Sequence, residues 1–226
     1  MSAVTVAEAA ERLGVSRQAV HGLISSGRLV KAGTVGRTAL VDLASLERAE
    51  RTRARRGRPW TESTAWGALS LLSGGSAEWM EGTHRSHLKR WLRDLGVDDV
   101  IDLARGRAAV RRFRTTPDVV DELRGHLLPT GAAALADAET ARLFGLTEGA
   151  GTADGYVMAG DAVRLQEGLG LIDDREGNVT IREVTLNAPF AAGSVPIAAV
   201  ALDLLESPGT REQSAGRRVL EELLRA

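Results

Sequence analysis

The chain has 226 residues, of which 43% are hydrophobic and 4% aromatic, and its formal net charge at pH 7 is −1. This length suits two small domains or one average domain, and the scarcity of aromatic residues is typical of helical packing by Leu, Ala and Val. The sequence has no signal-peptide pattern and no apolar run of the roughly 18 residues that a membrane span needs, so it predicts a cytoplasmic protein. It has no cysteine, which excludes disulfides and thiolate metal sites.

The charges are distributed unevenly along the chain. Residues 1–60 contain 11 Arg and Lys against 5 Asp and Glu, whereas residues 116–226 contain 9 against 18. A basic segment suits a polyanionic partner and an acidic one does not. We therefore expect a domain over residues 1–52, a basic linker over 53–60, and a second domain over 61–226 with a sub-boundary near 116–155.

The first thirty residues carry the pattern of two short helices joined by a turn. Thr5 and Glu8 fit a capping box, and apolar residues then recur at the spacing of one helix face. Gly14 interrupts this pattern, Ser16 can cap a second helix, and Gly27 can end it. Two helices this close in sequence predict a helix-turn-helix.

The second helix separates into an apolar and a polar face at 100° per residue. The apolar face, which is expected to pack on the first helix, carries Ala19, Val20, Leu23 and Ile24, and the polar face carries Arg17, Gln18, His21 and Ser25. Arg can pair with guanine and Gln with adenine in the major groove, and the N-terminal half of a recognition helix makes such contacts. An ordinary solvated face is the alternative, which the basic charge of this segment disfavours.

Residues 28–41 predict a β-hairpin, because two short apolar stretches flank a turn that contains Gly33 and Gly36. Arg28, Lys31 and Arg37 would line this wing and could contact phosphate. Asp42 is expected to cap a third helix. The segment VAEAAERLGVSRQAVHGLISSGRL resembles a winged helix-turn-helix of the excisionase/MerR-like type. That resemblance implies that this domain binds double-stranded DNA.

Residues 53–60, RARRGRPW, follow as the basic linker. The tetrad Arg56-Gly57-Arg58-Pro59 also has the composition of an arm that enters the minor groove of A·T-rich DNA. Minor-groove contact, non-specific attraction to phosphate and a plain linker all remain open. The residues predicted to contact DNA are Ser16, Arg17, Gln18, His21, Arg28, Lys31, Arg37, Arg55, Arg56 and Arg58.

The rest of the chain predicts a mostly helical α+β domain with small sheets. A helix capped near Thr61 is expected first, followed by one after Gly82 with Trp91 facing inward. Further helices are expected over 117–127, 161–169, 196–207 and 210–225. The last of these would open with a capping box from Thr210 to Gln213. Strands are expected over 107–116, 156–159 and 179–184. The whole chain is therefore assigned to a mainly α (α+β) class, with the winged helix-turn-helix at its N-terminus.

The sequence shows no pattern of a catalytic site. It contains no P-loop, nucleophile elbow, HExxH motif or dinucleotide-binding glycine pattern. The spacing of Glu81, His84 and His87 is more typical of a solvated helix face than of a zinc site. We expect no enzyme activity, no metal and no cofactor.

The segment VPIAAVALDLLESPGTREQSAGRRVLEELL resembles the C-terminal part of AbiEi-family antitoxins, with the likeness carried by residues Asp203–Arg211. GRPWTESTAWGALSLLSGG is similar to the segment that follows the DNA-binding domain in actinobacterial relatives. The resemblance implies a bacterial antitoxin that represses its own operon by binding inverted repeats in its promoter, and that counters a nucleotidyltransferase-like toxin. It would then associate with the nucleoid. Because one domain that reads a few base pairs is usually too weak for regulation, we expect a homodimer or multiple copies on DNA. The alternative is a stand-alone transcriptional regulator whose C-terminal domain dimerises or senses a ligand.

Overall fold

The computed structural model describes residues 3–13, 15–25, 29–35, 38–54, 59–147 and 152–226. The chain separates into two compact units, Met1–Gly57 and Arg58–Ala226, which we call the head and the body. Within the described residues, no helix combines the length and the apolar character that crossing a membrane requires.

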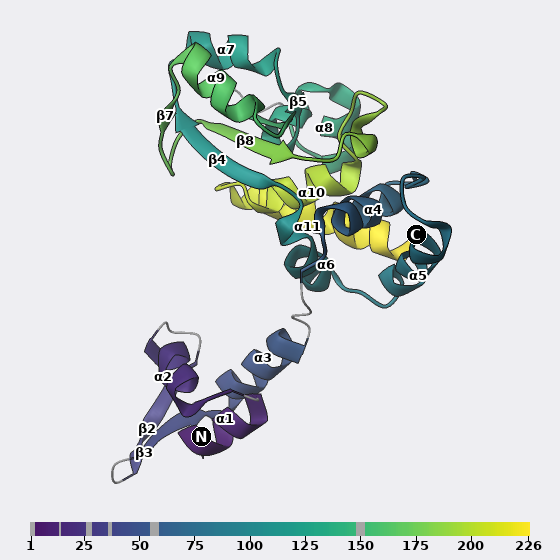
Figure 1. The fold of residues 1–226 in the computed structure, drawn as a ribbon. Coiled ribbons are helices and arrows are strands. Elements are labelled where there is room, and N and C mark those ends of the chain that lie inside the picture. The colour runs from purple at the N-terminus through teal and green to yellow at the C-terminus, as the bar shows by residue number, and fades with distance from the viewer. Residues whose placement is uncertain (1–2, 14, 26–28, 36–37, 55–58, 148–151) are drawn as a thin grey trace. The chain divides into compact units, whose positions relative to one another are not determined.

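The head is a helix-turn-helix with a β-hairpin wing (Figure 1). Its elements in chain order are β1 (Ala3–Thr5), α1 (Val6–Leu13), α2 (Arg17–Ser25), β2 (Lys31–Val35), β3 (Thr38–Asp42) and α3 (Leu43–Ala54). The strands form an antiparallel sheet of order β1-β3-β2, in which Lys31 lies opposite Val41. The predicted winged helix-turn-helix is thus confirmed, whereas β1 was not predicted, because three residues are too few to show an alternating pattern.

Side-chain caps fix the starts of the head's helices. Thr5 Oγ1 accepts a hydrogen bond from the Glu8 amide at 3.2 Å, and Ser16 Oγ accepts one from the Ala19 amide at 3.2 Å. The Asp42 carboxylate accepts one from the Ser45 amide at 2.8 Å. These three predicted caps are confirmed, and they satisfy amide groups that have no partner within their own helix.

A small apolar core joins the helices of the head to its sheet. Its buried members are Val6, Ala9, Ala10, Leu13, Val20, Leu29, Val41 and Leu46. Leu23 and Ile24 are half-buried against this core, but Ala19, which was expected to face it, is exposed. The predicted helix breaks at Gly14 and Gly27 lie outside the described residues. Helix α3 continues to Ala54 and so includes the first two residues of the segment expected to be linker.

The body contains a five-stranded sheet of order β5-β6-β8-β4-β7. The strands are β4 (Ala109–Arg114), β5 (Leu128–Pro129), β6 (Ala153–Met158), β7 (Ile172–Asp173) and β8 (Val179–Val184). Strands β6 and β8 are parallel, with Tyr156 opposite Arg182, and the other pairs are antiparallel. The structure confirms the strands expected near 107–116, 156–159 and 179–184.

Helices cover both faces of this sheet (Figure 1). The α-helices of the body are α4 (Glu62–Leu72), α5 (Gly82–Leu92), α6 (Val97–Leu103), α7 (Pro117–Arg124), α8 (Ala138–Phe144), α9 (Asp161–Leu169), α10 (Ile197–Leu205) and α11 (Thr210–Arg225). Helices α7 and α9 pack on one face, over Phe113, Val157 and Ile181. The opposite face, with Tyr156 and Val184, belongs to the larger core that contains α4 and α10. Neighbouring residues of β6 therefore serve different cores, because their side chains alternate across the sheet.

Helix α10 lies at the centre of the larger core. All its residues from Ala198 to Leu204 are buried, and it packs along α11 and against α4. A glycine makes the contact with α11 close, because a Cβ atom at Gly216 would lie 2.5 Å from the carbonyl oxygen of Ala201. The two helices therefore approach each other at a separation that only glycine allows.

Two expectations for the body are wrong. Trp91 was expected to face inward, but it is 45% exposed and meets the buried Trp60 edge-on, with ring centroids 5.5 Å apart. The predicted capping box at the start of α11 is absent, because Gly209 is the N-cap residue and Thr210 is already helical. The Gln213 side chain instead donates a hydrogen bond to the carbonyl oxygen of Ser207 at 2.7 Å.

A buried network of charges connects α10 to the sheet. The Asp203 carboxylate, whose side chain has no exposed surface, pairs with Arg107 and, at 3.2 Å, with Arg182. Asp203 also accepts hydrogen bonds from the Thr130 hydroxyl at 2.5 Å and the Tyr156 hydroxyl at 2.8 Å. Every donor that a buried carboxylate needs is therefore supplied by the surrounding elements.

Two further carboxylates complete the network. Asp154 pairs with Arg182 at 2.8 Å, and Glu206 binds Arg107 at 2.8 Å and Arg182 at 2.6 Å. Burial lowers the pKa of Arg107, but Asp203, Tyr156 and Glu206 together raise it above its ordinary value. Both guanidinium groups are therefore charged and neutralised inside the body.

Candidate nucleic-acid interface

The exposed face of α2 is the first part of the candidate interface. Arg17, Gln18 and His21 are all exposed, whereas Val20 on the opposite side is completely buried. The cap at Ser16 holds the first turn of the helix, and the Ser25 hydroxyl donates to the carbonyl oxygen of His21 at 3.0 Å. The core side of α2 thus anchors the helix, and its polar side is free to enter a groove of DNA.

A hollow of about 560 Å³ lies between α2 and the wing. Arg17 and His21 reach it from α2, and Lys31 reaches it from β2. The remaining described residues that line it are Thr5, Val6, Ala7, Thr34 and Ala39, and none of these side chains is a carboxylate. A concave, basic surface with hydroxyl groups beside it is suited to the phosphate backbone of DNA.

The hollow brings together some of the predicted contact residues of the head and not others. Arg17, His21 and Lys31 come together in it, whereas Gln18 lies on the exposed face of α2 outside it. The contacts of Arg17 and Gln18 with base edges and of Lys31 with phosphate stay predictions. Ser16 Oγ accepts the capping bond, which leaves its hydroxyl proton and a second lone pair for other partners.

Thr5 and Thr34 line the same hollow, although the sequence did not mark them as contact residues. Thr5 was assigned only a capping role. Thr34 lies in the wing three residues after Lys31, and its proximity to α2 depends on the pairing of β2 with β3. That pairing is the signal that could have identified Thr34.

The other predicted contacts, Arg28, Arg37, Arg55, Arg56 and Arg58, lie outside the described residues. Their contact with DNA stays a prediction, as does the entry of the tetrad Arg56-Gly57-Arg58-Pro59 into the minor groove.

Residues 3–53 match the family model of the helix-turn-helix domain. The head is a DNA-binding helix-turn-helix domain. The match ends within α3 and leaves the body outside it. No curated protein and no solved structure matches the chain.

In the part of the chain with described positions, no group of three or more His, Cys, Asp and Glu side chains is placed to hold a metal ion. Nδ1 of His84, in the first turn of α5, lies 3.9 Å from Oε2 of Glu81, the N-cap residue of this helix, and both side chains are exposed.

Proposed function

We propose that this chain is the antitoxin and transcriptional autorepressor of a toxin–antitoxin operon. The DNA-binding part of this proposal rests on the convergence of Arg17, His21 and Lys31 on one hollow of the head, with Gln18 exposed on the same helix as Arg17. Helix α2 would enter the major groove, where Gln18 reads a base edge, and the wing would hold the adjacent phosphates. A homodimer would bind the two halves of an inverted repeat.

The basic segment after α3 would add affinity. Arg55, Arg56 and Arg58 would contact phosphate or the minor groove next to the site that α2 reads. Contacts to phosphate alone would strengthen binding to every sequence equally, whereas minor-groove contact would favour sites flanked by A·T base pairs.

The antitoxin part of the proposal is supported by the segment Asp203–Arg211, which resembles AbiEi-family antitoxins. Asp203 and Glu206 of this segment belong to the buried network of charges in the body. The resemblance thus includes residues that stabilise the fold of the body. This supports the proposal that the body has the fold of an AbiEi-family antitoxin. The body would counter a nucleotidyltransferase-like toxin encoded next to it.

A mobility-shift titration on the DNA upstream of the protein's own gene tests autorepression. The full chain should shift this DNA in excess competitor, and Gln18→Ala should reduce the preference for it by about 1–3 kcal/mol. Arg225→Ala is the matched control, since Arg225 is an exposed residue of the body and forms an ion pair with Glu221 of the same helix, α11. Equal affinity for the upstream DNA and the competitor would refute autorepression.

Co-expression with the product of the adjacent gene tests the antitoxin role separately. If that product arrests growth, the wild-type chain should restore growth, and so should the double variant Arg17→Ala/Lys31→Ala, which is impaired in DNA binding. Growth that stays arrested in both cases would exclude the antitoxin role and favour a stand-alone regulator.

A further inference from the structure

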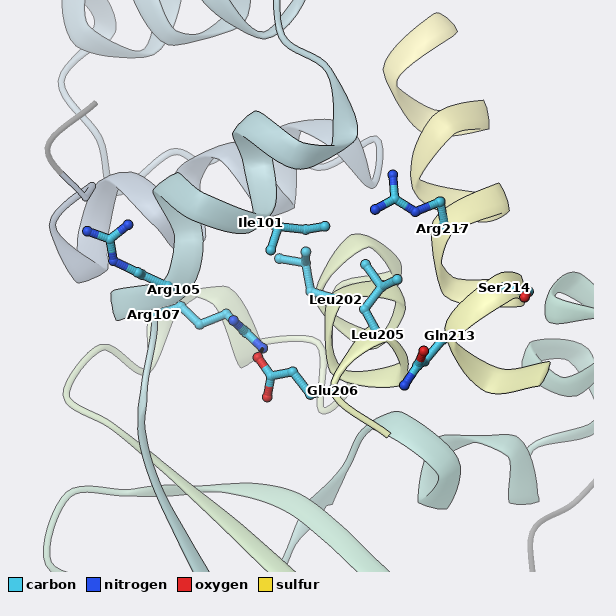
Figure 2. A pocket seen from close by; sticks show the side chains of 9 residues that line it. All are labelled: Ile101, Arg105, Arg107, Leu202, Leu205, Glu206, Gln213, Ser214 and Arg217. Carbon is cyan, nitrogen blue, oxygen red and sulfur yellow. Dashed lines mark hydrogen bonds and ion pairs between the residues drawn. The ribbon is translucent and has the colours of Figure 1, made fainter. Parts of the chain in front are cut away.

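A second hollow, of about 420 Å³, lies in the body between α6, α10 and α11. Figure 2 shows the nine residues that line it, which are Ile101, Arg105, Arg107, Leu202, Leu205, Glu206, Gln213, Ser214 and Arg217. Small-molecule sites in proteins have volumes of about 300–1,000 Å³ and combine an apolar wall with a few polar groups. The hollow meets both conditions.

The apolar wall is formed by Ile101 from α6 and by Leu202 and Leu205 from α10, whose side chains converge in Figure 2. Leu202 is only 2% exposed, and Ile101 and Leu205 are half-buried. A ligand that covered this wall would remove apolar surface from water, at roughly 25 cal/mol for each Å².

Most polar groups around the hollow are already engaged. Arg107 uses its guanidinium on Tyr156, the Ala104 carbonyl oxygen, Asp203 and Glu206, and Glu206 is held by both Arg107 and Arg182.

Two other lining groups turn elsewhere. The side chains of Arg105 and Ser214 point away from the apolar wall in Figure 2, and they donate to the carbonyl oxygens of Asp102 and Thr210.

Arg217 is the exception. One of its guanidinium nitrogens binds Asp98 at 2.7 Å, and among the described residues its other nitrogens have no hydrogen-bond partner. This ion pair is 45% and 64% exposed at its two side chains, and such surface pairs contribute about 0–1 kcal/mol. A carboxylate from solution could therefore replace Asp98 with little loss and bind the guanidinium through two parallel hydrogen bonds.

We propose that this hollow binds a small organic acid, with the carboxylate on Arg217 and the apolar part against Ile101, Leu202 and Leu205. Gln213 donates through its nitrogen to Ser207, which leaves its side-chain oxygen to accept a hydrogen bond from a hydroxyl or amino group of the ligand. The proposed site lies wholly in the body, and ligand binding there requires neither DNA nor a toxin.

Phenylacetate is a suitable probe, with 2-phenylethanol as a neutral molecule of similar shape. The chain contains five isoleucines, so the δ1-methyl NMR spectrum of the full-length protein is simple enough to locate binding. Phenylacetate should shift the Ile101 methyl signal and leave that of Ile24 in the head unchanged, with a Kd below about 10 mM. The neutral probe should bind at least about tenfold more weakly.

Two substitutions in the exposed ion pair should change the affinity in opposite directions. Arg217→Gln should weaken phenylacetate binding about tenfold, and Asp98→Asn should strengthen it about twofold to fivefold by removing the competing carboxylate. Arg225→Gln, on the same helix but outside the hollow, should have no effect. An unshifted Ile101 signal, equal binding of the two probes, or unchanged affinity in Arg217→Gln would each overturn the proposal.

Discussion

Replacement of Asp203 by asparagine should destabilise the body strongly. Asp203 receives contacts from two guanidinium groups and two hydroxyl groups, and its side chain has no exposed surface. Asparagine has the same shape, but it has no charge, and its NH2 group would face donors. Removal of one partner from a buried ion pair costs about 3–5 kcal/mol. Because Asp154 and Glu206 still neutralise the arginines in part, we expect the lower end, about 3 kcal/mol.

Urea unfolding followed by tryptophan fluorescence measures this loss in the body alone. The four tryptophans, Trp60, Trp66, Trp79 and Trp91, all lie in the body. With a urea dependence of about 2 kcal/mol per molar, a loss of about 3 kcal/mol lowers the midpoint by about 1.5 M. Such a change is a large part of the 5–15 kcal/mol by which a domain is typically stable.

Asp98→Asn is the matched control, because it also removes a carboxylate from an arginine, but from an exposed pair. Its midpoint should stay within about 0.5 M of the wild type, since such pairs contribute at most about 1 kcal/mol. If Asp203→Asn shifted the midpoint no more than Asp98→Asn, the buried network would not be a main source of the body's stability.

Three other outcomes are expected. Burial raises the pKa of Glu206, but Arg107 and Arg182 lower it more, to below its ordinary 4.5. The ionised Glu206 therefore stabilises the body above pH 4.5, and this contribution is lost as the pH falls. As the pH is lowered from 6 to 3, the urea midpoint should fall less steeply in Glu206→Gln than in the wild type. Lys31→Ala should weaken DNA binding on all sequences and reduce the salt dependence by about one phosphate contact, and an unchanged slope in mobility-shift titrations at several salt concentrations would remove Lys31 from the interface. Gly216→Ala should cost about 1–3 kcal/mol in urea unfolding, because its methyl group would overlap the Ala201 carbonyl; full stability would mean that α11 can move away freely.

The elements that the sequence predicted well are those with local signals. The caps at Thr5, Ser16, Asp42 and Thr61 were readable because a side chain satisfies an amide three residues away. The strand at residues 179–184 was readable because its flanking turn residues and β-branched side chains agree. These features depend on neighbours in the sequence, so tertiary structure had little opportunity to override them.

The features that were missed depend on distant partners. Helices α6 and α8 have seven residues each, too few for a clear apolar period. Asp203 stands in an aliphatic helix, and nothing near it indicates that Arg107 and Arg182, from different strands or loops, will neutralise it. In the same way, the hollow that joins Arg17 to Lys31 appears only when the wing folds against α2.

The order of the network residues along the chain, with Asp203 after Arg107 and Arg182, has a consequence for biosynthesis. Arg107 and Arg182 leave the ribosome before the carboxylates of Asp203 and Glu206 that neutralise them, and the packing of α10 along α11 must wait until α11 has emerged. The head, by contrast, closes its core with residues 6–46 and is complete early in translation. Domains generally fold as units in order of synthesis. A nascent chain that has emerged beyond the head but not yet beyond Asp203 would therefore carry a finished DNA-reading domain attached to a body that had not yet folded.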